Sequence, residues 1–126
     1  MKYLYICLAL IACLAVTSCS KKGDAQPTVH TVRFQATGTA SMTAVVSVVR
    51  ASTTTSTTLD TKTVATGTTY DFSTPLNNGD AIHFELQTMS ENAVSYTVSD
   101  NGTIVSQVTG KELGSFSKTT ADFVLN

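Results

Sequence analysis

A strict alternation of apolar and polar residues is the feature that most constrains the fold of this chain. The run from Ala81 to Thr88 shows it most clearly. Such a period of two residues is typical of a half-buried β-strand. Residues 31–36 alternate in the same way, with Val32, Phe34 and Ala36 on the inward side. In the clearer run the predicted inward residues are Ile82, Phe84 and Leu86, and the predicted outward residues are His83, Glu85 and Gln87.

Further short strands are predicted between turn residues. Residues 43–50 are apolar enough on both faces to form a central strand, residues 62–65 form a short strand, and Pro75–Gly79 is predicted to be a turn. Another turn is bracketed by Gly110 and Gly114, after which Phe116 and residues 121–125 close the domain. The abundance of Thr, Ser and Val favours sheets over helices, because β-branched side chains fit a pleated surface.

These patterns predict the fold class. We expect an all-β domain at residues 29–126, an antiparallel β-sandwich that is immunoglobulin-like in the loose sense, with about seven to eight short strands. No helix longer than a turn is expected there. The run Ser52–Thr58 is predicted to be an exposed loop or edge strand, although O-glycosylation or a contact surface for sugars or a protein are alternatives.

The segment around Asn101-Gly102 predicts a β-hairpin with two alternative registers. A two-residue turn would pair Asp100 with Thr103. A three-residue loop with Gly102 in the left-handed conformation gathers the apolar residues on one face, so we predict this second register. It would pair Val98 with Ile104 and Val94 with Val108.

The N-terminus is typical of an exported protein. Lys2 supplies a positive charge, and an apolar run extends from Leu4 to Val16. This run is shorter than the roughly 20 apolar residues that a membrane-spanning helix needs. Residues 1–18 are therefore predicted to be a cleaved signal helix, with cleavage between Ser18 and Cys19.

The sequence Val16-Thr17-Ser18-Cys19 resembles the lipobox of bacterial lipoproteins. The resemblance implies that the Cys19 thiol carries a lipid, because a thiolate is the nucleophile that attacks the lipid donor. Leu10-Ile11-Ala12-Cys13 fits the same pattern, but cleavage there would leave an apolar mature N-terminus. A plain signal peptide with a chance cysteine is the other alternative. Residues 19–28 are then a lipidated cysteine followed by a flexible tether that contains Gly23 and Pro27.

The cysteines and charges exclude several classes of site. All three cysteines lie at or before position 19, so neither a disulfide framework nor a cysteine zinc site is expected in the domain. Charged residues make up 13% of the chain and the formal net charge is −1, which disfavours nucleic-acid binding. No catalytic motif, metal site or cofactor site is predicted. His30 and His83 are interpreted as solvated strand residues, and the aspartates as residues of turns and strand ends.

The order of strands and turns resembles that of small β-sandwich lipoproteins of the Bacteroidetes type. The residues that carry this resemblance are Ala36–Ala40, Tyr70–Phe72, Asn78–Asp80 and Asn101-Gly102. It also resembles the soluble domain of the mycobacterial membrane protein small (MmpS) family. That second resemblance implies an accessory role beside an export pump, although the MmpS proteins have a transmembrane helix where this chain has a lipidation signal.

The sequence as a whole predicts a lipid-anchored, non-enzymatic binding or assembly module of the bacterial outer membrane. Its partners would be the membrane, through the lipid, and a protein or glycan that loops or an exposed sheet edge contact. Two alternatives stay open, an accessory subunit of an envelope export machine and an enzyme or inhibitor that uses loop residues. The side of the membrane, periplasmic or surface-facing, is also open.

Overall fold

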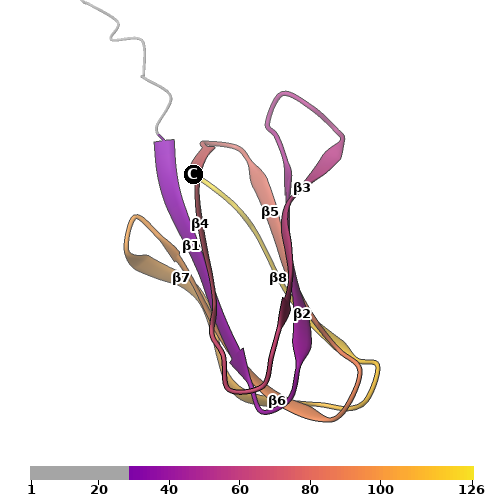
Figure 1. Cartoon of the computed structure of the whole chain (residues 1–126). Coiled ribbons are helices and arrows are strands. Elements are labelled where there is room, and N and C mark those ends of the chain that lie inside the picture. Colours follow the sequence, from indigo (N-terminus) through magenta and orange to yellow (C-terminus); the bar gives the residue numbers. More distant parts are fainter. Residues whose placement is uncertain (1–28) are drawn as a thin grey trace, which may run out of the picture.

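The computed structural model describes residues 29–126 as two four-stranded antiparallel sheets packed face to face (Figure 1). This confirms the predicted all-β sandwich. The predicted signal helix, the cleavage site at Ser18 and Cys19, and the tether lie outside the described residues. The eight strands are β1 (Val29–Gly38), β2 (Met42–Val49), β3 (Ser56–Val64), β4 (Tyr70–Asn77), β5 (Ala81–Thr88), β6 (Asn92–Asp100), β7 (Thr103–Leu113) and β8 (Lys118–Val124).

The chain crosses repeatedly between the two sheets. Sheet A has the strand order β4-β1-β6-β7, and sheet B has the order β3-β2-β5-β8. Only the connections β2–β3 and β6–β7 join neighbours within one sheet, while every other connection passes from one sheet to the other. β1 therefore lies at the centre of sheet A and β2 at the centre of sheet B, which confirms the central position predicted for residues 43–50.

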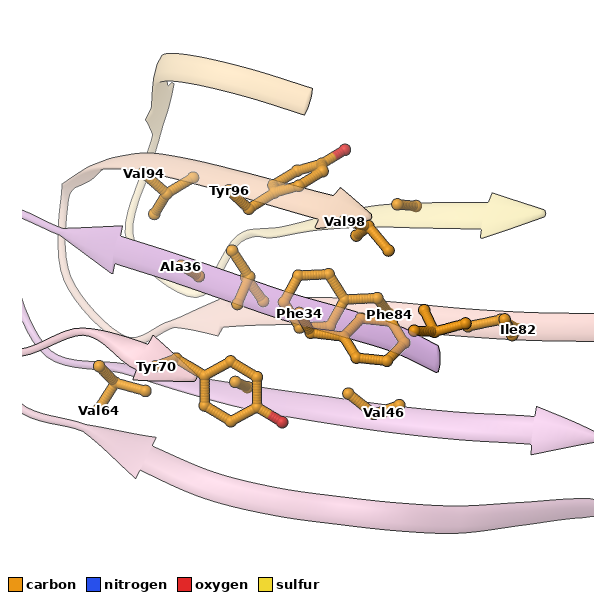
Figure 2. Packing of buried hydrophobic residues seen from close by; sticks show 14 of the residues in the cluster. Phe34, Ala36, Val46, Val64, Tyr70, Ile82, Phe84, Val94, Tyr96 and Val98 are labelled. Atoms are coloured by element: carbon orange, nitrogen blue, oxygen red, sulfur yellow. The ribbon is translucent and has the colours of Figure 1, made fainter. Parts of the chain in front are cut away.

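An aromatic cluster fills the space between the sheets. Phe84 of β5 lies at its centre, with its ring centroid 5.3 Å from that of Phe34, 5.9 Å from that of Tyr70 and 5.7 Å from that of Tyr96 (Figure 2). The Tyr70 hydroxyl donates a hydrogen bond of 2.7 Å to Asp60, so its polar end is satisfied. Aliphatic side chains from both sheets complete this core. As predicted, it includes Val32, Phe34, Ala36, Ile82, Phe84 and Leu86.

The predicted register of the β6–β7 hairpin is wrong. Asn101 (φ 48°) and Gly102 (φ 84°) form a two-residue turn, and Asp100 pairs with Thr103. Two residues with positive φ match the right-handed twist of the flanking strands. The extra residue lies further along, at a bulge that includes Val105, so that Tyr96 pairs with Val108. Val108 packs against the core, whereas Ile104 and Val105 stay exposed.

Four other predicted boundaries need correction. β4 continues through Pro75, because an edge strand needs no N–H donor on its open side, and the turn is confined to Asn78-Gly79. β3 is longer than predicted because it also includes residues 56–58 of the Thr/Ser run, which form the exposed edge strand that was one of the predicted alternatives. Gly110 (φ 59°) lies within β7, beside the second bulge of the hairpin, and not in a turn. Phe116 (φ 56°) belongs to the loop before β8 and is 80% exposed.

Buried polar side chains close both ends of the sandwich. At the end where β1 begins, the Asp80 carboxylate accepts hydrogen bonds from the backbone N–H groups of Asn77 and Ala51 and from Arg50. These bonds hold the pKa of Asp80 below its ordinary value, although burial opposes them. At the opposite end, the Asn92 side chain accepts from Ala40 N–H and donates to Ala40 C=O, at 3.0 Å each. The loops are thereby attached to the core without disulfides.

The hairpin geometry predicts a specific order of stability for two variants at Asn101. Both Asn101→Gly and Asn101→Ala remove the bond that the Asn101 side chain accepts from Thr31 N–H. Only alanine also places a Cβ in the left-handed region, which costs about 1–2 kcal/mol. Urea unfolding should therefore show the glycine variant to be the more stable of the two by about that amount. In a three-residue loop, position 101 would have negative φ and alanine would be the more stable variant, so the reverse order contradicts the two-residue turn.

Candidate functional site

The outer face of sheet A contains a shallow polar groove. It consists of two concavities of about 640 Å³ and about 240 Å³ that share Gln35 and Thr97 in their linings. The lining residues come from all four strands of the sheet, from the β6–β7 turn and from the loop before β4. The larger concavity is lined by Thr31, Arg33, Gln35, Ser73, Thr97, Ser99, Asn101, Gly102 and Ile104, and the smaller one by Gln35, Ala36, Thr37, Thr69, Ser95, Tyr96, Thr97, Gln107, Val108 and Thr109.

Strand register arranges these side chains in two rows across the sheet. In the first row Arg33 of β1 pairs with Ser73 on one side and with Ser99 on the other, and Ser99 pairs in turn with Ile104. The second row consists of Asp71, Gln35, Thr97 and Gln107, in the order β4, β1, β6 and β7. Directly paired residues point to the same face of a sheet, so both rows face the groove.

The charge of Arg33 on β1 is neutralised by Asp71 on the neighbouring strand β4. Its guanidinium donates two hydrogen bonds to the Asp71 carboxylate, with Nε 2.9 Å from Oδ1, and Gln35 donates a third at 3.3 Å. The bond to Arg33 is the main reason why the pKa of Asp71 lies below its ordinary value, and the same bond raises the pKa of Arg33. Both side chains are about half exposed, so the pair adds little stability but leaves this part of the groove without net charge.

Most hydroxyl and amide groups of the groove form no hydrogen bond with other side chains. Among residues 29–126, the side chains of Ser73, Thr97, Ser99 and Gln107 make none. The side chains of Thr97 and Ser99 are half-buried on β6, so they lie at the floor of the groove. These groups can still donate to and accept from a ligand.

The outer face of sheet B differs, because it carries several charged side chains and these bond to one another. The imidazole of His83 lies 2.5 Å from Asp122, and Lys118 Nζ lies 2.7 Å from Glu85. Glu85 also accepts a hydrogen bond from Gln87, which is the largest cause of its lowered pKa, followed by the bond from Lys118. Glu85 lies on the outward side as predicted, yet it is only 7% exposed because these partners cover it. These contacts occupy the charged groups of the face, whereas the hydroxyls of Thr43 and Ser47 make no hydrogen bond with another side chain of residues 29–126.

One cross-strand row of sheet B contains the residue types of a serine-histidine-aspartate triad. Ser47 pairs with His83, and His83 pairs with Asp122. A triad requires a hydrogen bond between the serine hydroxyl and the imidazole. The contacts of the His83 ring in this structure go to Asp122 and, at 3.7 Å, to Glu85. We therefore describe this row as part of the ion-pair network and assign no nucleophile.

His30 is buried, which corrects its interpretation as a solvated residue. It is 5% exposed and points between the sheets at the end where β1 begins. Its Nδ1 lies 2.6 Å from Asp100 Oδ2, and its Nε2 contacts the Asn78 side-chain oxygen. The bond to Asn78 and then the bond to Asp100 raise the pKa of His30 above its ordinary value of 6.5, because two acceptors favour the doubly protonated ring. The alternation of β1 was the signal that could have revealed this burial, since His30 is in phase with Val32 and Phe34.

The remaining predictions about sites concern metals, membrane spans and the lipid. Within residues 29–126, no group of three or more His, Cys, Asp or Glu side chains is arranged to hold a metal ion. In the same part of the chain, no helix is long and apolar enough to cross a bilayer. Cys19 and Ser18, the predicted lipid and cleavage positions, lie outside the described residues.

The His30 cluster predicts a pH dependence of stability. A histidine whose pKa is raised on folding adds stability below the unfolded-state pKa of 6.5, and this contribution disappears as the pH rises through the folded-state pKa. The free energy of unfolding of the wild type should exceed that of His30→Gln most at pH values below 6.5, and the difference should shrink as the pH rises. Urea titrations across this range measure it, with His83→Gln, at a half-exposed histidine on the other sheet, as the comparison variant. A difference that grows with pH would contradict the assignment.

Comparison with known proteins adds no relative: no family model, no curated protein and no solved structure matches this chain. What the groove can bind is therefore argued from its own side chains. The groove lies on a sheet face, whereas the sequence indicated loops or a sheet edge as the contact surface. The outward positions of β1 were visible in the sequence, but the register that joins them to Ser73, Thr97 and Gln107 was not.

Proposed function

We propose that this chain is a lipid-anchored lipoprotein of the bacterial outer membrane whose sandwich acts as a non-catalytic binding module. The anchor is supported by the apolar run that ends at Val16 and by the lipobox-like sequence before Cys19. Two or three acyl chains on one cysteine would hold the protein stably, whereas one chain gives marginal attachment. The first strand begins at Val29, so an anchor at Cys19 joins the domain through a short tether.

The polar groove of sheet A is the observation that carries the binding role. Sheets A and B have the same size, yet the concavities on sheet A are lined mainly by hydroxyl and amide residues, whereas the concavity of about 350 Å³ on sheet B is lined mainly by apolar ones. A small set of convergent polar groups in a concave surface is the usual form of a ligand site. The groove also has a rigid floor, because β1 and β6 are hydrogen-bonded to neighbours on both sides.

The position of the groove suits a domain that is attached at one end. β1 enters the sandwich at the end where the Asn101-Gly102 turn lies, and the C-terminus lies at the same end (Figure 1). The groove extends from this turn along the side of the domain. In an anchored protein it would therefore begin near the membrane and be exposed on the side of the domain. The loop that contains Phe116 lies at the opposite end, away from the anchor.

Site-specific photocrosslinking in living cells tests the binding role without knowledge of the ligand. A diazirine amino acid replaces Thr97 in the full-length anchored protein, and a second variant carries it at Thr43, which is half-buried on the outer face of sheet B and lies on a strand that is likewise paired on both sides. We expect adducts of defined added mass from position 97 alone. Equal labelling from both positions, or none from either, would contradict a binding site on sheet A.

A further inference from the structure

The groove has polar groups in abundance but almost no net charge. Arg33 and Asp71 neutralise each other at one side of the groove. Every other polar side chain that lines it is a hydroxyl or an amide. A charged ligand would lose its hydration without gaining an opposite charge, which is unfavourable. The groove therefore favours a ligand that is polar and uncharged.

The spacing of these groups favours a ligand with many hydroxyls. Neighbouring strands lie about 4.8 Å apart, and alternate residues of one strand lie about 6.7 Å apart. Thr97 and Ser99 are alternate residues of β6, and Gln35 and Gln107 flank Thr97 on the two neighbouring strands. Hydroxyls and amides can each both donate and accept, so this grid complements a ligand that presents groups of both kinds along its length.

An extended peptide fits this face poorly. Peptides that add to a sheet bind through the backbone of an unpaired edge strand. The floor of the groove is formed by β1 and β6, and the backbones of both strands are already paired on either side. Nucleic acid is disfavoured too, because its phosphates require free cations and the one arginine of the groove is occupied.

We infer that the polar groove binds a neutral oligosaccharide, and this inference rests on the binding role proposed above. The hydroxyls of Thr97 and Ser99 and the amides of Gln35 and Gln107 bond to sugar hydroxyls across the two rows. Ile104 lies at the end of the first row and is 55% exposed, so it offers an apolar surface to the C–H face of a sugar ring. The groove has no exposed aromatic platform in its lining, so binding depends mainly on hydrogen bonds.

Calorimetric titration of the full-length anchored protein in detergent micelles tests this inference. The probes are neutral oligosaccharides built from glucose, mannose, galactose or N-acetylglucosamine, and sulfated and sialylated oligosaccharides serve as charged counterparts. We expect at least one neutral probe to bind with a dissociation constant that does not change between about 0.05 M and about 0.5 M salt, because no charge pairing is involved. Binding of charged probes alone, or of none, overturns the inference.

Two matched substitutions locate the site. Thr97→Val removes one hydroxyl from the groove while keeping a β-branched side chain, and Thr43→Val makes the same change on sheet B. Loss of one neutral hydrogen bond should weaken binding about fivefold for Thr97→Val, and Thr43→Val should leave the affinity unchanged. Equal effects of the two variants overturn the placement in the groove. Thermal melts of both variants verify that the fold is retained.

Photocrosslinking from position 97 separates this inference from the proposed function. If position 97 forms adducts in cells but no neutral oligosaccharide binds, the ligand class is wrong and the binding module stands. If position 97 forms no adducts and no oligosaccharide binds, both fail.

Discussion

The contact of Phe84 with three aromatic rings is the interaction on which the two-sheet arrangement depends. Phe84 belongs to sheet B, whereas Phe34, Tyr70 and Tyr96 come from three strands of sheet A. Aromatic pairs add stability beyond the apolar area that they bury, and a domain without disulfides depends on such a core. Because the sheets meet through these rings, they determine which side of β1, β4, β5 and β6 faces the core. A shift of one residue in any of them would turn its apolar set towards solvent.

Once the inward residues are fixed, the outward residues are free to differ between the sheets. On sheet B the charged residues form ion pairs and hydrogen bonds with neighbouring side chains, so the polar groups around Glu85 already have partners. On sheet A a single pair, Arg33 with Asp71, removes the charge, and the hydroxyls of Thr97 and Ser99 stay available. The same architecture thus yields one face whose charged groups pair with each other and one face whose groove is lined mainly by neutral hydroxyls and amides. At the sandwich ends, the buried polar groups His30, Asp80 and Asn92 hold the adjoining loops through hydrogen bonds.

The sequence predicted the fold class and most of the core, because alternation reports directly on which side of a strand faces inward. It located Phe34 and Phe84 and the central position of β2 correctly. It failed where a local signal competes with the wider apolar pattern: the Asn101-Gly102 turn keeps its preferred geometry, and a bulge inside β7 brings Val108 to the core while Ile104 and Val105 stay exposed. It also missed the groove, because a site made of side chains from four strands depends on long-range register. Among these errors, only the solvated interpretation of His30 could have been avoided from the sequence, because the alternation of β1 places His30 on the inward side.

Attachment to a membrane through Cys19 is the central claim of this account, because it decides where the groove operates. The most direct measurement is intact mass combined with membrane fractionation of the wild type, Cys19→Ala and Cys13→Ala, expressed in a Gram-negative host. The account predicts that the wild type and Cys13→Ala partition with membranes at an acylated, signal-cleaved mass, whereas Cys19→Ala carries no acyl chains. A wild type that is released without acyl chains, or acylation that is lost in Cys13→Ala and retained in Cys19→Ala, would contradict it.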